Sequence, residues 1–245
     1  METRLGRRAI LAKLAITPAA TIAAAQAIPL AWSSTPVAGA TQSPVTTLEI
    51  ETDRTALLIL DFQPRWLETL SDPHIVVERA AAALTAARAA GMLVAFCRVA
   101  FEAADYAAVP EGNIIFDAIS RPVGALDDGN SDLEITPELA PRSSEKVIRK
   151  TRVSAFARTD LDEWLRAMEI DTLLLAGIST SGVILSTVCE GADLDYRLIV
   201  LQDACADTDP VIQQTLMQRV FPQRAEVATV EQIVDVFEKV LSPGS

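Results

Sequence analysis

Three short segments of this 245-residue chain carry side chains that could take part in catalysis. An apolar run ends at Asp61, a second segment contains Lys150, and the turn 177–183 reads Gly-Ile-Ser-Thr-Ser-Gly-Val. A carboxylate in a partly apolar cleft has a raised proton affinity, which suits acid–base catalysis. A lysine beside it would hold it ionised or stabilise developing negative charge. Backbone N–H groups of a turn that opens a helix can receive an anion or a polarised carbonyl.

Each of these residues also has a purely structural interpretation. Asp61 could end its strand and cap the next turn, and Lys150 could be a solvated lysine for which Lys146 is a competitor. The turn 177–183 could be an ordinary connection between a strand and a helix. The functional interpretation depends on whether the fold brings the three segments together.

Apolar runs alternate with helical patterns from about Thr52 onward, which predicts where these segments lie. The predicted strands are 56–60, 92–99, 147–149, 172–176, 197–202 and 226–229, and the predicted helices are 75–90, 160–169, 181–194, 211–220 and 231–241. Apolar strands that are each followed by a helix indicate a parallel sheet covered on both faces. All three segments then lie at carboxyl ends of strands, where such sheets bind ligands. The irregular segment 101–145 is expected to line the site.

The segments 56–63, 147–150 and 176–183 together resemble the isochorismatase-like hydrolases, also called the cysteine hydrolase superfamily. Lys-x-x-x-Ser-x-Phe at Lys150, Ser154 and Phe156 and the stretch Asp-Ala-Cys-Ala-Asp at 203–207 extend the resemblance over about residues 52–230. It implies an α/β fold, a three-layer α/β/α Rossmann-like arrangement with a six-stranded, mostly parallel sheet of order 3-2-1-4-5-6. It also implies an unusual, cis peptide bond near Ser179–Thr180.

The family typically combines an Asp, a Lys and a Cys, and the resemblance assigns the first two roles to Asp61 and Lys150. Val183 stands at the position of the Cys, and a valine cannot support covalent thioester chemistry. Isochorismatases proper also lack the Cys and, as the family is understood, hydrolyse a vinyl ether by an acid–base route. The residues expected to bind substrate are Phe62, Gln63, Trp66, Phe156, Ser179, Thr180, Ser181 and Gly182.

Other nucleophiles, metals and cofactors find little support in the sequence. Cys189 would lie roughly 240° around the helix from Val183, and Ser181 would need Lys150 as its base because the single histidine, His74, is expected at the surface. One histidine cannot build a nicotinamidase-like metal site, and the acidic run 127–132 lacks the spacing of a calcium loop. We therefore expect no metal, and the chain contains no nucleotide-binding glycine pattern that would indicate a cofactor.

Two functions from different classes fit these features. The first is a hydrolase that acts on a C–N or C–O bond of a small organic substrate by Asp/Lys acid–base chemistry, without a covalent cysteine intermediate. The alternative is a catalytically inactive protein that binds a small molecule on the same scaffold. A third, weaker hypothesis is a structural or assembly subunit.

The N-terminal segment resembles a twin-arginine export signal. Gly-Arg-Arg-Ala-Ile-Leu at 6–11 is followed by a mildly apolar stretch, and Ala-Gly-Ala at 38–40 offers a cleavage site. The predicted organisation is therefore a signal peptide 1–40, a linker 41–51 and a hydrolase domain 52–245, with a periplasmic or secreted mature protein. An uncleaved anchor, a disordered extension and a cytoplasmic location are the alternatives.

Charge and cysteine content limit the partners of the domain. The net charge is −12, and the balance is −15 without residues 1–40, which hold four basic residues and one acidic residue. So acidic a body argues against nucleic acid or an anionic membrane as a partner. We expect a small-molecule substrate, no nucleic acid, no stable membrane insertion after processing, and a homo-oligomer, either a dimer or a tetramer. Cys97 and Cys205 are expected to be buried, and a Cys189–Cys205 disulfide stays open.

Overall fold

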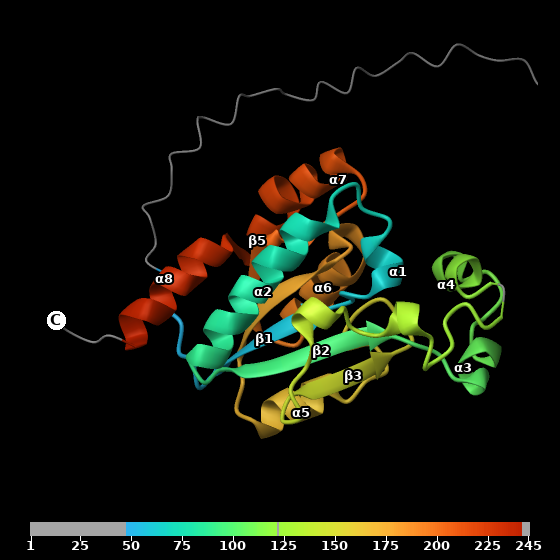
Figure 1. Cartoon of the computed structure of the whole chain (residues 1–245), viewed down its shortest axis with the longest axis horizontal. Helices are drawn as coiled ribbons and strands as arrows, with labels where there is room; N and C mark the ends of the chain where they lie inside the picture. The colour runs from blue at the N-terminus through green and yellow to red at the C-terminus, as the bar shows by residue number, and fades with distance from the viewer. Residues whose placement is uncertain (1–47, 122, 242–245) are drawn as a thin grey trace, which may run out of the picture. The chain divides into compact units, whose positions relative to one another are not determined.

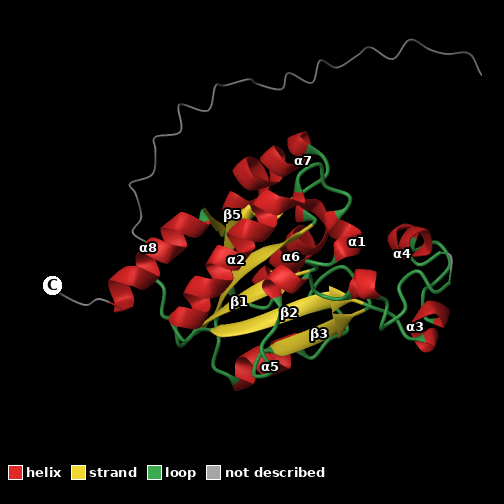
Figure 2. Ribbon diagram, in the orientation of Figure 1, coloured by secondary structure: helices red, strands yellow, loops and turns green. Residues whose placement is uncertain are grey.

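A six-stranded parallel sheet forms the centre of the domain (Figures 1 and 2). This computed structural model describes residues 48–121 and 123–241, so the predicted signal peptide 1–40 and most of the predicted linker 41–51 lie outside the described residues. The strands are β1 (Thr55–Leu60), β2 (Leu93–Val99), β3 (Lys146–Lys150), β4 (Thr172–Ile178), β5 (Arg197–Ala206) and β6 (Glu226–Ala228). Their order, β3-β2-β1-β4-β5-β6, confirms the predicted fold class and topology.

Helices cover both faces of this sheet and form two apolar cores. The helices are α1 (Pro64–Leu67), α2 (Pro73–Ala89), α3 (Ala103–Ala107), α4 (Ile114–Ile119), α5 (Leu161–Ala167), α6 (Leu185–Asp193), α7 (Pro210–Thr215) and α8 (Val230–Leu241). The core that includes residues of α2 and α8 lies on one face, and the core that includes residues of α5 and α6 lies on the other. Three-layer packing follows because the central strands β1 and β4 are buried and largely apolar on both faces.

Local signals explain where the main helices begin and end. The Asp72 side chain accepts a hydrogen bond from the His74 N–H at 3.3 Å at the start of α2, and Gly91 follows the helix with a left-handed φ of 69°. At the start of α5 the N-cap is Asp160, whose side chain makes no capping hydrogen bond. The neighbouring Thr159 hydroxyl accepts a hydrogen bond from the Leu161 N–H at 3.4 Å and donates to the Ala155 carbonyl at 2.7 Å.

Two predicted helices begin or end as wider π-helical turns. Thr180–Ile184 is a π-helical turn before α6, and Leu216–Val220 is one after α7. The segment 101–145 is less irregular than predicted, because it contains α3, α4 and two 3₁₀ turns, Ser131–Leu133 and Pro137–Leu139. Figure 1 shows α3 and α4 standing apart from the layers of the main body.

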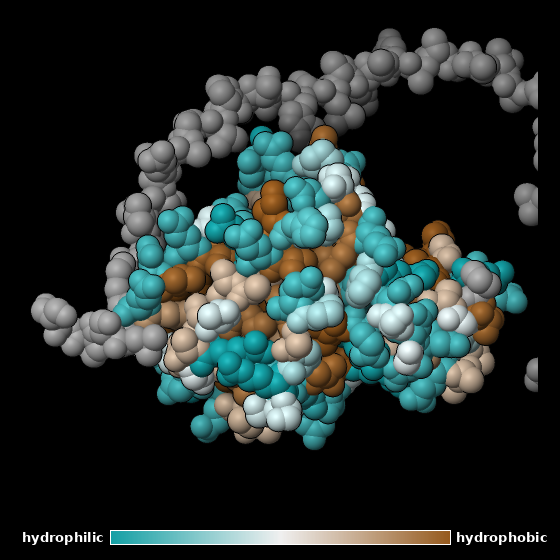
Figure 3. Space-filling view, viewed as in Figure 1, coloured by the Kyte–Doolittle hydropathy of each residue, from teal (hydrophilic) through white to brown (hydrophobic). Residues whose placement is uncertain are grey.

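A groove between α2 and α8 is lined mainly by apolar side chains. Brown residues lie between these helices in Figure 3, and they border a groove of about 580 Å³. The groove is lined by Ala81, Ala82, Thr85, Ala86, Ala89, Val234, Phe237 and Glu238. No helix within residues 48–121 and 123–241 combines the length and apolarity needed to cross a membrane. Oligomerisation and export stay predictions.

Candidate active site

Asp61 and Lys150 meet in a buried ion pair at the carboxyl edge of the sheet. Asp61 directly follows β1 with a left-handed φ of 58°, and its backbone N–H donates to the Cys97 carbonyl at 2.9 Å. The distance from Lys150 Nζ to Asp61 Oδ2 is 2.8 Å. Both side chains are almost inaccessible, with residue exposures of 5% for Asp61 and 1% for Lys150. The fold therefore brings together the two residues for which the sequence predicts acid–base roles.

The Lys150 ammonium group has no N–H left for a ligand. Beyond the bond to Asp61, it donates to the backbone carbonyls of Arg152 at 3.1 Å and Val153 at 2.9 Å. A lysine has three donors, so these contacts use all of them. Lys150 can act on a reaction through its charge and by orienting Asp61, rather than by direct hydrogen bonding to substrate.

Burial gives the Asp61 carboxyl an unusual proton affinity. Desolvation raises its pKa from 3.8 to about 6, although the charge and hydrogen bond of Lys150 act in the opposite direction. The second oxygen, Asp61 Oδ1, is buried and has no hydrogen-bond partner among the described residues. Asp61 can therefore exchange a proton near neutral pH through an oxygen that the protein leaves free.

The turn after β4 lies beside the end of β1, because β4 and β1 are neighbouring strands. β1 and β4 pair in parallel with Leu60 opposite Gly177, at the point where the strand order reverses. Gly177 is required by this close approach, because a Cβ there would lie 2.8 Å from the Leu60 carbonyl oxygen. The peptide bond Ile178–Ser179 is cis, one bond before the predicted position.

Two backbone donors of this turn are already occupied. The Ser181 N–H donates to Asp207 Oδ2 at 2.7 Å, and the Gly182 N–H donates to Ser179 Oγ at 3.1 Å. The sequence predicts that N–H groups here receive an anion or a polarised carbonyl. For Ser181 and Gly182, oxygens of the protein itself take that place in this structure.

Val183 is part of the apolar core. It is 2% exposed and belongs to the same cluster as Ile184 and Val188. The three cysteines are free, so Cys189 and Cys205 do not form a disulfide in this structure. Cys97 and Cys205 are buried, as expected. Burial raises the pKa of the Cys97 and Cys205 thiols to about 12, which keeps them protonated and unreactive.

Two aromatic residues predicted to contact substrate lie in the cores instead. Phe62 is 1% exposed within the core on the α2 face, and Phe156 is 6% exposed and stacks on Tyr196 with ring centroids 5.6 Å apart. Both rings therefore pack in the apolar cores, and their contact with substrate stays a prediction. Trp66 is half-buried, and its Nε1 donates to Gln63 Oε1 at 3.0 Å.

Gln63 is fully buried and fully hydrogen-bonded. Its Nε2 donates to the carbonyls of Val99 at 2.9 Å and Leu133 at 2.6 Å, and its Oε1 accepts from the Val99 N–H at 2.9 Å as well as from Trp66. No polar atom of this side chain is free for a ligand. The geometry gives Gln63 a positioning role in place of the predicted substrate contact.

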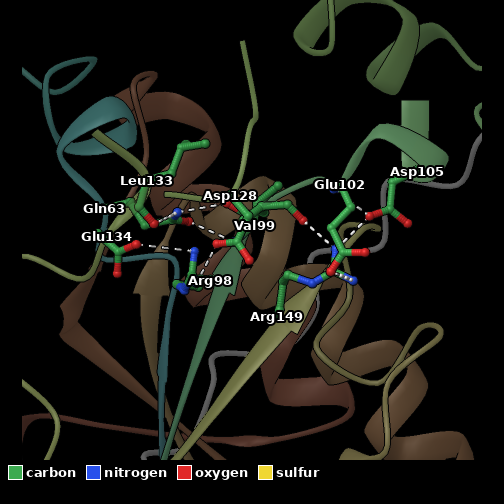
Figure 4. A network of polar contacts seen from close by, with 10 residues as sticks. Gln63, Arg98, Val99, Glu102, Asp105, Asp128, Leu133, Glu134 and Arg149 are labelled. Carbon is green, nitrogen blue, oxygen red and sulfur yellow. Dashed lines mark hydrogen bonds and ion pairs between the residues drawn. The ribbon is translucent and has the colours of Figure 1, made fainter. Parts of the chain in front are cut away.

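Two arginines fasten the segment 101–145 to the same edge of the sheet (Figure 4). Arg149 on β3 pairs with Asp105 at 2.6 Å and Glu102 at 3.4 Å, and Arg98 on β2 pairs with Asp128 at 2.7 Å. Sequence reasoning missed both arginines. Their signal was a basic residue near the carboxyl end of each of two neighbouring strands, followed by an acidic irregular segment.

Several buried polar side-chain atoms near this edge of the sheet have no hydrogen-bond partner. Five such atoms occur among the described residues: Asp61 Oδ1, Arg65 Nε, Arg98 Nη1, Thr180 Oγ1 and Gln213 Oε1. Of these, Arg98 Nη1 forms an ion pair with Glu134 Oε1 at 3.7 Å. Asp61, Arg65 and Arg98 follow or end β1 and β2, and Thr180 follows β4. Gln213 bonds to the carbonyl of Cys205 near the end of β5. Because buried polar atoms are normally paired, these atoms are suited to contacts with water or with a polar ligand.

The described residues contain no cluster of three or more potential metal ligands. A buried Asp–Lys pair at the reversal point of a 3-2-1-4-5-6 sheet is the arrangement that the resemblance to isochorismatase-like hydrolases implies. Comparison with known proteins gives the same class. The Isochorismatase domain profile matches residues 55–232.

Relatives and solved structures extend the match over most of the domain. The isochorismatase family protein YecD of Escherichia coli O157:H7 is 32% identical over 199 residues, which cover 77% of this chain and 98% of YecD. The ureidoacrylate amidohydrolase RutB of Acinetobacter baylyi is 32% identical over 184 residues, which cover 67% and 75%. A cysteine hydrolase from Pseudomonas syringae pv. phaseolicola superimposes with a TM-score of 0.71 at 24% identity, with coverages of 81% and 99%. The chain therefore belongs to the isochorismatase family and is one of its hydrolases.

Proposed function

We propose that this protein hydrolyses a C–N bond of a small amide or ureido compound by acid–base catalysis, without a covalent cysteine intermediate. The observation that carries the proposal is Asp61, which is buried, has a pKa of about 6 and presents an unpartnered Oδ1. The similarity to RutB, a ureidoacrylate amidohydrolase, supports a C–N bond over the C–O bond that the sequence leaves open. Val183 supports a route without thiol chemistry.

The reaction follows from the two oxygens of the carboxylate. Lys150 binds Oδ2, so Oδ1 is the oxygen that removes a proton from water. The water oxygen forms a bond to the substrate carbonyl carbon, and the C–N bond breaks as Asp61 returns the proton to the leaving nitrogen. One water is consumed, and an acid and an amine or ammonia are released. The positive charge of Lys150 keeps Asp61 ionised between turnovers and offsets negative charge that develops near it.

The second candidate function is small-molecule binding without catalysis. The specific observation in its favour is Val183, which replaces the expected thiol with an apolar side chain that is packed into the core. Such a protein would keep a polar pocket at the sheet edge but would turn nothing over.

The test measures release of ammonia or amine from a panel of small primary amides and ureido acids. We expect turnover by the wild type, unchanged after treatment with iodoacetamide, and a loss of about 10²- to 10⁴-fold in Asp61→Asn. The matched control is Asp53→Asn, the same substitution at an exposed carboxylate before β1, which should keep wild-type activity. Saturable binding by the wild type and by Asp61→Asn, with no turnover of any compound, would replace the proposal with the binding function.

A further inference from the structure

Gln213 on α7 carries a buried amide oxygen that no described residue contacts by a hydrogen bond. Its Nε2 donates to the backbone carbonyl of Cys205 at 3.0 Å. A carbonyl can only accept, so this bond fixes which end of the amide faces the strand and leaves Oε1 facing away from it. A buried acceptor without a donor is unfavourable, so Oε1 is suited to a donor that the protein itself does not supply.

The position of Gln213 connects this oxygen to the candidate active site. Cys205 pairs with Gly177 across β5 and β4, and α7 packs against the π-helical turn Thr180–Ile184. Thr180 is fully buried, and its Oγ1 is also without a partner among the described residues. Asp61 Oδ1 follows the next strand, β1.

These three oxygens share one chemical property. The side chains of Asp61, Thr180 and Gln213 all offer acceptor lone pairs, and they come from the carboxyl ends of three adjacent strands, β1, β4 and β5. A group with several N–H donors, such as a terminal NH₂, can satisfy more than one of them. A group that ends in oxygen without a hydrogen would bring its lone pairs toward the two pure acceptors, Asp61 Oδ1 and Gln213 Oε1, although the Thr180 hydroxyl can also donate.

We infer that Gln213 determines substrate specificity by accepting a hydrogen bond from a terminal NH₂ group of the substrate. It selects amide and ureido compounds over the corresponding esters and carbamates, because the oxygen-terminated analogue leaves Gln213 Oε1 unpaired. The inference rests on the proposed C–N hydrolysis and adds a residue from α7 that neither acts as acid nor as base.

The test compares two probes that differ only at this terminal group, N-carbamoylglycine and N-(methoxycarbonyl)glycine. Their affinities are measured by calorimetry for the full domain as wild type, Gln213→Met, Gln213→Glu and Gln214→Met. We expect the wild type to prefer the NH₂ probe by about 10- to 100-fold. Gln213→Met keeps the length of the side chain but has no oxygen, so it should lose the preference through weaker binding of the NH₂ probe alone.

Two further variants separate specificity from structural support. Gln214→Met is the same substitution at the neighbouring, exposed residue, and it should keep the wild-type preference. Gln213→Glu keeps an acceptor oxygen, and when its carboxyl is protonated its O–H can donate to the Cys205 carbonyl in place of the amide N–H. At a pH that protonates it, this variant should retain the preference, which gives a second test if Gln213→Met does not fold. A merely structural role of Gln213 would weaken both probes equally in Gln213→Met, and this result would overturn the inference.

The same proteins distinguish failure of the inference from failure of the proposed function. Ammonia release from N-carbamoylglycine together with an unchanged probe preference in Gln213→Met would leave the hydrolysis standing and overturn the role of Gln213. A preference that depends on Gln213, without turnover of any compound, would leave the role of Gln213 standing and overturn the proposed hydrolysis. If the wild type binds neither probe at millimolar concentration, the role of Gln213 is overturned.

Discussion

The two halves of the candidate active site differ in the reactive groups that they contain. At the ends of β1 and β3, Asp61 and Lys150 form a buried pair with one carboxylate oxygen free. At the end of β4, Val183 lies in the apolar core, and the N–H groups of Ser181 and Gly182 are bonded to the protein itself. The first half is equipped to move protons, and the second has no nucleophile at the expected position.

This difference is possible because the Asp61–Lys150 pair and position 183 lie on separate elements of the fold. The Asp61–Lys150 pair depends on β1, β3 and the loop after β3, none of which contains the nucleophile position. The nucleophile can therefore be lost while the proton-transfer machinery stays intact. Variants on either half should change different properties, and the largest effects belong to the ion pair.

Lys150→Met should have the largest effect. It leaves the buried Asp61 carboxylate without its counter-charge, which we expect to lower the free energy of unfolding by about 3–5 kcal/mol. Urea denaturation measures this loss. The control is Lys146→Met on the same strand, where the ammonium pairs with the exposed Asp160, and the loss should stay below about 1 kcal/mol. Equal losses in both variants would show that the buried Lys150–Asp61 pair stabilises the fold no more than the exposed Lys146–Asp160 pair does.

The pH dependence of kcat/KM should report the Asp61 carboxyl. Because its pKa is about 6 in the folded protein, the general base is protonated at lower pH, and kcat/KM should fall about tenfold per pH unit below that value. The raised pKa also means that the folded protein binds this proton more tightly than the unfolded chain does. Its contribution to stability is complete below 3.8, the ordinary value, and is lost as the pH rises through about 6. A pH–rate profile that is flat from about 5 to 8 would rule out Asp61 as the base.

Asp207→Ala tests the other half of the site with a smaller effect. The variant removes the oxygen that accepts from the Ser181 N–H, and a lost cap at a helical turn costs about 1 kcal/mol. Asp207→Asn keeps an acceptor oxygen and should remain within about 0.5 kcal/mol of the wild type. Thermal unfolding followed by circular dichroism measures both. If Asp207→Asn is as unstable as Asp207→Ala, the cap is not what Asp207 contributes.

Thiol alkylation should have the smallest effect on the wild type. Cys97 and Cys205 are buried with raised pKa values, and no cysteine occupies position 183, so iodoacetamide should leave the rate of hydrolysis unchanged. Val183→Cys places a thiol at the family's nucleophile position and should make the rate sensitive to alkylation. Val183→Thr, similar in shape but without a thiol, is the control. Inactivation of the wild type by iodoacetamide would show that a native cysteine takes part.

Simple rules predict the parallel sheet and the edge at which its polar residues meet, whereas the strand order and the choice of Lys150 over Lys146 come from the family resemblance. Apolar runs followed by helices imply parallel strands, and residues at the carboxyl ends of parallel strands converge on one edge. Neither rule requires knowledge of how individual side chains pack.

The remaining site residues depend on tertiary details that no local pattern contains. Phe62 and Phe156 flank the predicted catalytic segments, yet both turn into the cores, because aromatic rings gain most from burial in apolar surroundings. The amide of Gln63 contacts groups 36 and 70 residues away in the chain. Gln213 lies in a helix where a polar residue carries no sequence signal of a binding role.

The hydrogen bonds of Gln63 also determine which sequence changes the segment 101–145 can accept in variants of this protein. Its contacts with Val99 and Leu133 are made only to backbone atoms, so they do not depend on polar side chains at these two buried apolar positions. The chain between them can be replaced or lengthened at little entropic cost, provided that it returns one carbonyl to the same place. Gln63 thus provides a fixed attachment point for loops that can be exchanged. Loops with new substrate-facing surfaces could be grafted there without disturbing the sheet.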